Sequence, residues 1–593
     1  MKKKHRFHKA VSLSILVSVF FICFQPMADE ADSDPQQEAA QPVDSKATIT
    51  PGVTQTLTFE YFGDNGEYNE NSYGDDDNFY LIRNITYVQA FAPGFDLGLR
   101  LDGAFFQDPP ARVPAEDFQP GGSGYTLLDY DHDIRVERFH ARAQYEDFSL
   151  TGGDFYAGFG RGIILSMIKI DDLGIDNAIR GARAEYGLQD IIRITAIGGA
   201  VNSTNLEPTT HHVLRDDPED IIAGARIDIE ASTPFVIGLH SVYVKPRFED
   251  ESEIDPGRLN VDQGTGVGII SGGGSMELNT EPVHLYVEGN GQQHDNYRPP
   301  LGADDVENES GYAFFSEISV FTGSLTSKLE GLFYHRWLME GPLRGTGGSL
   351  SQPVPYHHMV TLEPKWMVIK SLGNEWGGRL TEDVLFEEAR TQITAMATCL
   401  KYEGGLMPQG EWTDHPPTII LHPIVRLRQD FGSSGVLVVA EGGYRHEWES
   451  DEDDEGYLGH GSLDLTFPLT EGHTMEAKEE LRRHHLDVTE ENEYWISTAT
   501  ISYDMVGLWG IALTHEYSDQ TAGIEGEMWG RSFPLPRKHY AWALFNFHVP
   551  DPLDGLVIRV LGGSQRGGIK CAAGICRNYP DTMGVRLETV YRY

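Results

Sequence analysis

From residue 53 onward, hydrophobic and polar residues alternate with a period of two in one segment after another. In residues 457–467 and 509–517, apolar and small side chains mostly occupy one parity, and side chains such as His460, Asp464 and Glu516 occupy the other. Successive side chains of a strand point to opposite faces, so this pattern predicts strands with one apolar and one polar face. The lumen of a membrane barrel tolerates charged side chains, whereas the core of a sandwich does not.

The connections between the predicted strands alternate between short turns and long loops, which favours a transmembrane antiparallel β-barrel. Residues 374–402 interrupt this alternation with two strand-like runs, 374–386 and 390–402, which we count as one long strand. The count is then about 24 strands, an even number as expected for an outer-membrane barrel. The predicted strands are 53–62, 78–91, 95–106, 133–146, 148–156, 178–187, 190–201, 220–230, 235–245, 267–278, 283–290, 311–321, 324–338, 355–367, 374–402, 418–431, 435–448, 456–467, 473–485, 492–504, 508–518, 538–548, 555–565 and 583–593.

The last predicted strand alternates strictly and ends on the aromatic residue Tyr593. Its outer edge needs a partner, and pairing with the first strand would supply one and close the sheet. The ending resembles the C-terminal signal of bacterial outer-membrane β-barrels, which implies contact with the barrel-assembly machinery. We therefore expect a chain in three parts: a signal peptide at 1–28, a disordered periplasmic leader at 29–50 and an outer-membrane barrel at 51–593.

Residues 157–177 differ from the other long connections because they are rich in glycine and in large apolar side chains. Such compact hydrophobicity predicts packing, and we expect this segment to fold into the lumen and narrow it. Charges that line a lumen need partners of opposite sign. The candidate residues of this constriction are Asp154, Asp171, Asp172 and Asp176, with Arg161, Arg180 and Arg183 as their expected partners.

Two blocks of sequence, residues 152–183 and 563–577, are similar to a family of bacterial outer-membrane β-barrel proteins of unknown function. The first block contains the run from Gly158 to Ser166, and the second contains Cys571 and Cys576. The resemblance implies a barrel fold and a location in the bacterial outer membrane. It implies no activity, cofactor or catalytic residue.

The formal net charge of −44 disfavours nucleic acid as a partner, since phosphates would be repelled. It suits long acidic loops that are solvated or that associate with cations. The short spacing of Cys571 and Cys576 favours a local disulfide over a metal site in an exported protein. Cys399 is left without a partner and is expected to pack within a strand.

Candidate chemistry is weak elsewhere in the sequence. The glycine-rich run at 158–162 lacks the Lys-Ser/Thr of a phosphate loop, and adjacent histidines such as His357-His358 point to opposite faces of a strand. The acidic runs 75–77 and 451–455 lack the spacing of a defined calcium loop, and the alternating Asp129, Asp131 and Asp133 are a better cation candidate. No motif singles out a nucleophile, so we expect no enzyme activity, no cofactor and no dedicated metal site.

Two functions remain compatible with the sequence. The first is a channel or solute-uptake protein with an acidic lumen that favours cations and is narrowed by residues 157–177. The second is a plugged, non-conducting scaffold or surface-interaction protein that binds partners or cations through long acidic loops such as 107–132 and 246–265. Outer-membrane lipid is an expected partner in both cases.

Overall fold

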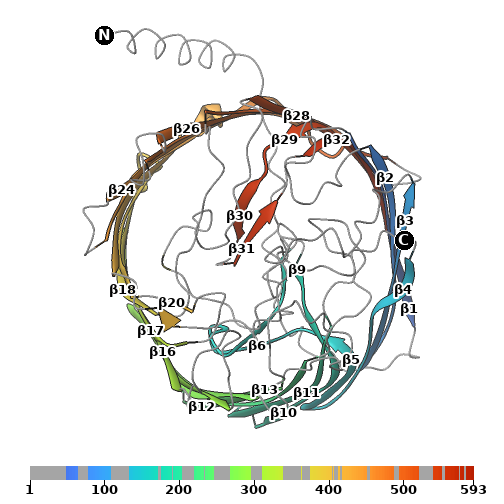
Figure 1. Ribbon diagram of the computed structural model, residues 1–593, viewed down its shortest axis with the longest axis vertical. Coiled ribbons are helices and arrows are strands. Elements are labelled where there is room, and N and C mark those ends of the chain that lie inside the picture. Colours follow the sequence, from blue (N-terminus) through green and yellow to red (C-terminus); the bar gives the residue numbers. More distant parts are fainter. Residues whose placement is uncertain are drawn as a thin grey trace.

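The computed structural model describes residues 49–63, 78–107, 133–170, 175–189, 191–202, 220–232, 234–245, 268–295, 310–337, 362, 374–403, 405–406, 412–413, 417–449, 455–485, 493–519, 539–550, 555–572, 575–579 and 582–592. In this part of the chain, 24 strands form one antiparallel sheet. The sheet closes because β1 (Thr50–Phe62) pairs with β32 (Thr582–Arg592) on one side and with β2 (Phe79–Ala92) on the other. Seen along its axis, the sheet forms a ring (Figure 1), which confirms the predicted all-β barrel.

Each remaining wall strand pairs with antiparallel neighbours around the ring. These strands are β3 (Phe95–Gln107), β4 (Asp133–Tyr145), β5 (Phe148–Phe155), β10 (Ala178–Leu188), β11 (Ile192–Asn202), β12 (Ile221–Ser232), β13 (Phe235–Lys245), β14 (Gly268–Thr280), β15 (Val283–Asp295), β16 (Ser310–Thr322), β17 (Leu325–His335), β18 (Glu375–Phe386), β19 (Thr391–Tyr402), β22 (Thr418–Asp430), β23 (Leu437–Glu449), β24 (Glu455–Thr470), β25 (His473–His485), β26 (Glu493–Met505), β27 (Trp509–Ser518), β28 (His539–His548) and β29 (Leu556–Gln565).

Four short two-stranded ladders interrupt the long connections. They are β6 (Ala157–Phe159) with β7 (Leu165–Met167), β8 (Lys169–Ile170) with β9 (Ile175–Asp176), β20 (Gly405–Leu406) with β21 (Trp412–Thr413), and β30 (Gly568–Ala572) with β31 (Ile575–Tyr579). A single turn of 3-10 helix, η3 (Gly432–Ser434), lies between β22 and β23. Across the described residues, no helix is long and apolar enough to cross a membrane.

The alternation of short turns and long loops holds over most of the described wall, but the connection 450–454 between β23 and β24 is no longer than the turn 431–436 before β23. The turn between β2 and β3 is typical: Gly94 has φ +73°, and a Cβ there would lie 2.7 Å from the carbonyl oxygen of Gln144. The prediction of one strand over 374–402 is wrong, because these residues form the hairpin β18–β19 with a short turn at 387–390. Of the predicted strand 355–367, only Leu362 is described, and it lies buried at a bend. The described wall has 24 strands, with β17 paired directly to β18 and the β18–β19 hairpin counted as two.

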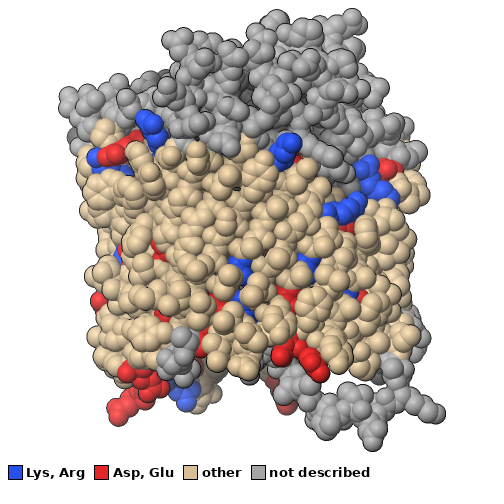
Figure 2. Space-filling model, turned by 90° about the horizontal axis from the view of Figure 1, so that it is seen from below, with Lys and Arg blue, Asp and Glu red and all other residues tan. Residues whose placement is uncertain are grey.

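The outer face of the wall is apolar. Leu463, Leu481 and Leu513 lie on this face near the middle of their strands and are exposed. Trp376 and Trp495 lie nearer the long-loop ends of their strands. The ammonium group of Lys401 lies over the ring of Trp376, and the guanidinium of Arg483 lies over the ring of Trp495. Most of the wall seen in Figure 2 consists of residues other than Lys, Arg, Asp and Glu. Mid-strand aliphatic residues with aromatic residues towards the rims are the pattern of a lipid-facing surface.

Two carboxyl groups share this outer face with the apolar residues. Glu382 on β18 accepts a 2.6 Å hydrogen bond from the Ser327 hydroxyl of β17, and Glu479 on β25 accepts a 2.7 Å bond from the Ser497 hydroxyl of β26. Glu479 lies directly opposite Leu463, so it faces outward with that leucine. A serine on the next strand therefore hydrogen-bonds to each of these two carboxyls.

The two faces of β24 are expected to respond oppositely to a new positive charge. Leu463→Arg would put a guanidinium at the lipid-facing middle of the strand and lower the free energy of unfolding by roughly 2–4 kcal/mol. Ser462→Arg, the matched control, would put it in the lumen opposite Glu441 and Glu480 and change stability little. Urea unfolding in lipid vesicles, followed by tryptophan fluorescence, measures both. Equal losses in the two variants would contradict this assignment of faces.

Candidate functional site

The chain leaves the wall after β5 and returns to it at β10. Phe155, the last residue of β5, lies opposite Ile179 of β10, so the two strands form a hairpin whose connection is residues 156–177. We call this connection the inner segment. Its strands β6 and β9 lie inside the ring in Figure 1, which agrees with the inward-folded segment expected from the sequence.

The inner segment packs against one side of the barrel interior. Its large apolar side chains Ile163, Ile164, Leu165 and Met167 are at most 1% exposed. Each contributes roughly 1.5–3 kcal/mol relative to a solvent-exposed position. The wall residues in the same cluster come from β5, β10 and strands between β11 and β22: Phe155, Ile179, Ile197, Val201, Ile222, Val242, Val244, Ile269, Tyr286, Ala313, Phe315, Leu332, Tyr334, Leu400, Tyr402 and Ile420.

Polar contacts fix the turn between β6 and β7 against β15 and β16. Gly160 has φ +61°, and a Cβ there would lie 2.3 Å from Oε1 of Glu288, so any other residue would be strained and would displace this carboxylate. The amide of Arg161 donates a 2.8 Å hydrogen bond to Oε2 of Glu288. The guanidinium of Arg161 lies 3.5 Å from Oε2 of Glu317 and 4.5 Å from the ring centroid of Tyr286.

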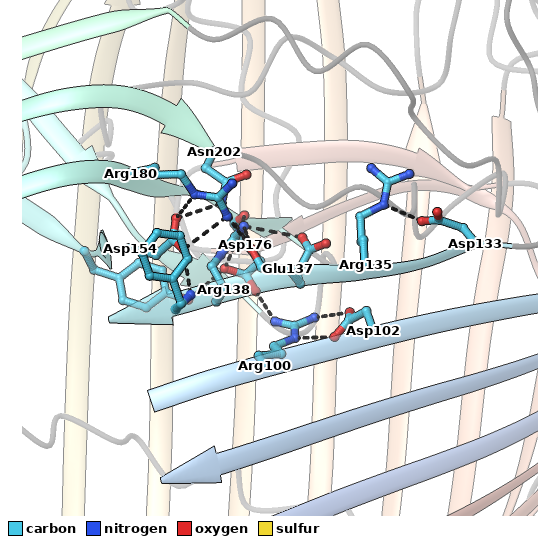
Figure 3. Close-up of polar contacts among 12 residues, drawn as sticks. Arg100, Asp102, Asp133, Arg135, Glu137, Arg138, Asp154, Asp176, Arg180 and Asn202 are labelled. Carbon is cyan, nitrogen blue, oxygen red and sulfur yellow. Dashed lines mark hydrogen bonds and ion pairs between the residues drawn. The ribbon is translucent and has the colours of Figure 1, made fainter. Parts of the chain in front are cut away.

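The end of the inner segment is held by Asp176, which is buried among arginines (Figure 3). Its Oδ2 accepts a 2.6 Å bond from Arg100 of β3, and its Oδ1 accepts bonds from Tyr156 (2.7 Å) and from Arg138 of β4 (3.3 Å). Arg138 also donates to the backbone carbonyl of Asp176 at 2.7 Å. Arg100 is itself oriented by a two-bond fork to Asp102, at 2.7 Å for each bond.

These contacts shift the pKa values of Asp176 and Tyr156, which are bonded to each other in the inner segment. Burial alone would raise the pKa of Asp176, but Arg138, the Tyr156 hydroxyl and Arg100 outweigh it and hold the pKa below its ordinary value of 3.8. Burial and the negative charge of Asp176 raise the pKa of the Tyr156 hydroxyl. Asp176 is therefore ionised and Tyr156 neutral at physiological pH, which preserves the hydrogen bond between them.

A β-bulge in β4 brings the guanidinium of Arg138 to Asp176. The register of β3 with β4 runs from Arg100–Arg138 to Leu101–Val136, so Glu137 is the extra residue. Bulges re-aim side chains and increase local twist. Both Glu137 and Arg138 are buried as a result, and the Arg138 guanidinium reaches the inner segment.

The ladder between β4 and β5 ends at His140–Gly153, although β4 continues to Asp133 beside β3. Beyond that point, side chains from β5, β10 and β11 contact the β4 backbone (Figure 3). The Phe139 amide donates to Oδ2 of Asp154 at 2.7 Å, and the Glu137 carbonyl accepts 3.1 Å bonds from both Arg180 and Asn202. We call this region of the wall, formed by Glu137, Phe139, Asp154, Arg180 and Asn202, the seam.

Asp154 is the centre of the seam. It forms a fork with Arg180 at 3.1 and 3.2 Å and accepts a 2.8 Å bond from Asn202. Its side chain is only 3% exposed, so it is a buried carboxylate with a full set of donors. Arg180 lies opposite Asp154 and Ala200, on the outer parity of its strand, and its guanidinium is 5.2 Å from the ring centroid of Phe139. Asp154 and Arg180 therefore lie in the wall, which corrects their expected place in the lumen.

The other candidate residues from the sequence are distributed differently from the expectation. Arg161 pairs with Glu317, and Arg183 pairs with Glu185 at 2.5 Å, so neither pairs with an aspartate of this set. Asp176 pairs with Arg100 and Arg138, which sequence reasoning did not select. Asp171 and Asp172 lie outside the described residues.

The cysteine and cation candidates have mixed outcomes. The backbone register places Cys571 directly opposite Cys576 in the β30–β31 ladder, and the disulfide between them stays a prediction. Cys399 is a free, exposed cysteine within β19. Of the three alternating aspartates, Asp129 and Asp131 lie outside the described residues, and Asp133 pairs with Arg135. The described residues contain no cluster of three or more side chains able to hold a metal ion.

Comparisons with known proteins describe what this chain is similar to. Residues 115–246 match the model of a family of unknown function (DUF6029), and this stretch contains both the seam and the inner segment. A comparison with curated proteins found no match. Among solved structures, the P pilus usher (PapC) translocation pore aligns with 8% identity and a TM-score of 0.39, covering 92% of this chain and 99% of its own.

Two further solved structures align over most of the chain. The ferric enterobactin receptor (PfeA) of Pseudomonas aeruginosa shows 9% identity and a TM-score of 0.46, covering 93% of this chain and 82% of its own. The copper transporter OprC shows 10% identity and a TM-score of 0.45, covering 92% and 80%. These TM-scores are low, so the fold assignment rests on the strand register of this chain itself.

The attachment of the inner segment is expected to weaken in acid. Because the pKa of Asp176 is lowered, its contribution is complete above pH 3.8 and is lost as the pH falls through the lowered pKa. Asp176→Asn should remove this pH dependence and weaken attachment at neutral pH by roughly 1.5–3 kcal/mol, the range for a charged hydrogen bond. Hydrogen exchange of the Asn177 amide, which donates to Ile168, reports the attachment. A wild-type protein whose exchange has no acid step would contradict the role of Asp176.

Proposed function

We propose that this chain is a channel of the bacterial outer membrane that admits small solutes and favours cations. The apolar outer face with aromatic residues towards the rims supports the membrane location. A closed ring of 24 strands encloses a wide bore unless something fills it. The long-loop end, from which the inner segment folds inward, is the end that faces outward in outer-membrane barrels.

The observation that carries the proposal is the one-sided packing of the inner segment. Its apolar cluster involves wall strands from β10 to β22. On the far side of the ring, the inward side chains of Arg559 in β29 and Arg586 in β32 are 52% and 48% exposed. The short β30–β31 ladder also lies within the outline of the ring on this side (Figure 1). Solvated charges beside a fixed, one-sided constriction support a water-filled path.

Conductance in planar bilayers tests this function. We expect discrete openings from the purified barrel and larger openings after residues 157–177 are replaced by a short turn. The replacement keeps the wall intact because Phe155 and Ile179 already pair at the end of the hairpin. Heat-dependent electrophoretic mobility checks that each variant is folded. Absence of conductance from both folded forms would contradict a pore and favour the plugged scaffold.

Cation preference is expected to arise where luminal carboxylates outnumber the arginine and lysine side chains that pair with them. Many are paired with arginine, such as Glu447 with Arg445, and Glu516 with Arg566. Near the short-turn end, however, Glu476 of β25 faces the lumen with Asp464 and Asp504 close enough for their charges to interact with it. Lys478 lies opposite Asp464 and offsets part of this charge.

Neutralising Glu476 should reduce the selectivity. In a salt gradient, Glu476→Gln is expected to move the reversal potential towards that of an unselective pore, because one negative charge leaves the lumen. Glu479→Gln is the matched control, since it removes a carboxylate from the outer face of the same strand and should leave the reversal potential unchanged. Equal shifts in the two variants would show that luminal charge does not set the selectivity.

A further inference from the structure

The seam is a place where the barrel wall depends on side chains instead of on a strand ladder. In the described chain, β10 pairs with β5 and β11, and β4 pairs with β3 and, up to His140, with β5. Beyond His140 the contacts between β4 and its neighbours include the bonds from Asp154, Arg180 and Asn202. A ladder separates only by breaking consecutive backbone bonds together, whereas side chains separate by rotating about their own torsions.

Both sides of the seam are apolar. On the outer face of β4, Ile134, Val136 and Phe139 are 71%, 45% and 41% exposed. Behind the seam, Ile179 of β10 and Val201 of β11 are buried at 0% and 2% exposure in the cluster that holds the inner segment. A hydrocarbon chain that passed between β4 and the ends of β5 and β10 would leave one apolar surface and reach another. Among the described residues, the polar side chains of the seam lie between these two surfaces, with Arg138 and Asp176 behind them.

The charges of the seam make opening feasible without stranding an ion in lipid. Arg180 and Asp154 are joined by a two-bond fork and can move together as a neutral pair. Directly inside, the Asp176 carboxylate accepts one bond from Arg138 at 3.3 Å and one from Arg100 at 2.6 Å. Displacing the seam therefore keeps these ions paired and breaks only the side-chain bonds to the Phe139 amide and the Glu137 carbonyl of β4.

We propose that the seam is a lateral passage through which the hydrocarbon chain of a membrane amphiphile enters the luminal apolar cluster from the bilayer. This inference rests on the membrane location in the proposed function and goes beyond the axial channel by naming a second substrate class, amphiphiles with a long hydrocarbon chain. The amphiphile reaches the lumen sideways from the lipid, while its polar head stays near the charges of the seam. Water-soluble ions use the axial path and do not need the seam.

Photolabelling from the lipid phase tests the passage. The barrel is placed in nanodiscs containing phosphatidylcholine with a diazirine on one acyl chain, a probe that cannot enter through water. Val136, on the outer face, should be labelled in every form and serves as the positive control. Label at Ile179 and Val201 is expected as well, and its absence would overturn the proposal, because both side chains are inaccessible unless the seam opens.

A crosslinked form separates opening at the seam from general loosening of the barrel. In a Cys399→Ser background, Phe139→Cys with Arg180→Cys is compared before and after bridging with a bifunctional thiol reagent of matching length. Bridging should reduce label at Ile179 and Val201 to the level of an unirradiated sample. The matched pair Ala196→Cys with Ala225→Cys spans the continuous β11–β12 ladder on the outer face, and bridging it should leave the label unchanged.

The remaining outcomes are also decisive. Luminal label that survives bridging of the seam would overturn the lateral passage, because the chain would then enter elsewhere. Conductance of the same preparations is recorded separately. If the barrel conducts but takes no luminal label, the channel is supported and the lateral passage is contradicted. If the barrel takes label but does not conduct, the lateral passage is supported and the channel is contradicted.

Discussion

Backbone hydrogen bonding governs this structure at every level. A wall in contact with hydrocarbon has no water to satisfy its amides and carbonyls, so each of them needs a partner within the protein. The ladder of 24 strands supplies these partners around the ring, and the pairing of β1 with β32 removes the last free edge. Where β5 turns inward, the same requirement is met by Asp154, Arg180 and Asn202, which bond to the β4 backbone.

The inner segment links the wall to function because it packs its apolar side chains against the apolar part of the barrel interior. A long connection could have remained outside, where its backbone would be hydrated. Here the burial of Ile163, Ile164 and Leu165 favours the inward position, and Asp176 fixes the end that returns to the wall. One hairpin therefore narrows the bore on one side and creates the seam where it leaves the wall. The constriction and the seam are two consequences of the same turn.

Local patterns in the sequence were sufficient to predict the wall and the inward position of the segment. Period-two alternation assigned Leu463 and Asp464 to opposite faces, and the run of isoleucines at 163–164 indicated packing. The alternation failed at 374–402, because a hairpin and a single long strand have the same local pattern of apolar and polar residues. Periodicity cannot distinguish a wall strand from a buried loop residue such as Leu362.

The partners at the site could not be predicted in the same way. Asp176 bonds to Arg100, which is 76 positions earlier in the chain, and Arg138 points towards it only because the bulge at Glu137 shifts the register. Asn202 belongs to the seam because β11 ends beside β4, a relation created by the early exit of β5. A bulge adds one residue and leaves little trace in the hydrophobic pattern, so its consequences appear only in three dimensions.

The central claim is that the tube has lipid outside and water inside. Nitroxide spin labels placed one at a time at residues 457–467 of β24 test it most directly, through collision rates with oxygen and with a water-soluble nickel chelate. Odd positions should favour oxygen and even positions should favour the nickel chelate, in step with the outward Leu463 and the inward Asp464. Collision rates without this two-residue period, or with the parities reversed, would contradict the account.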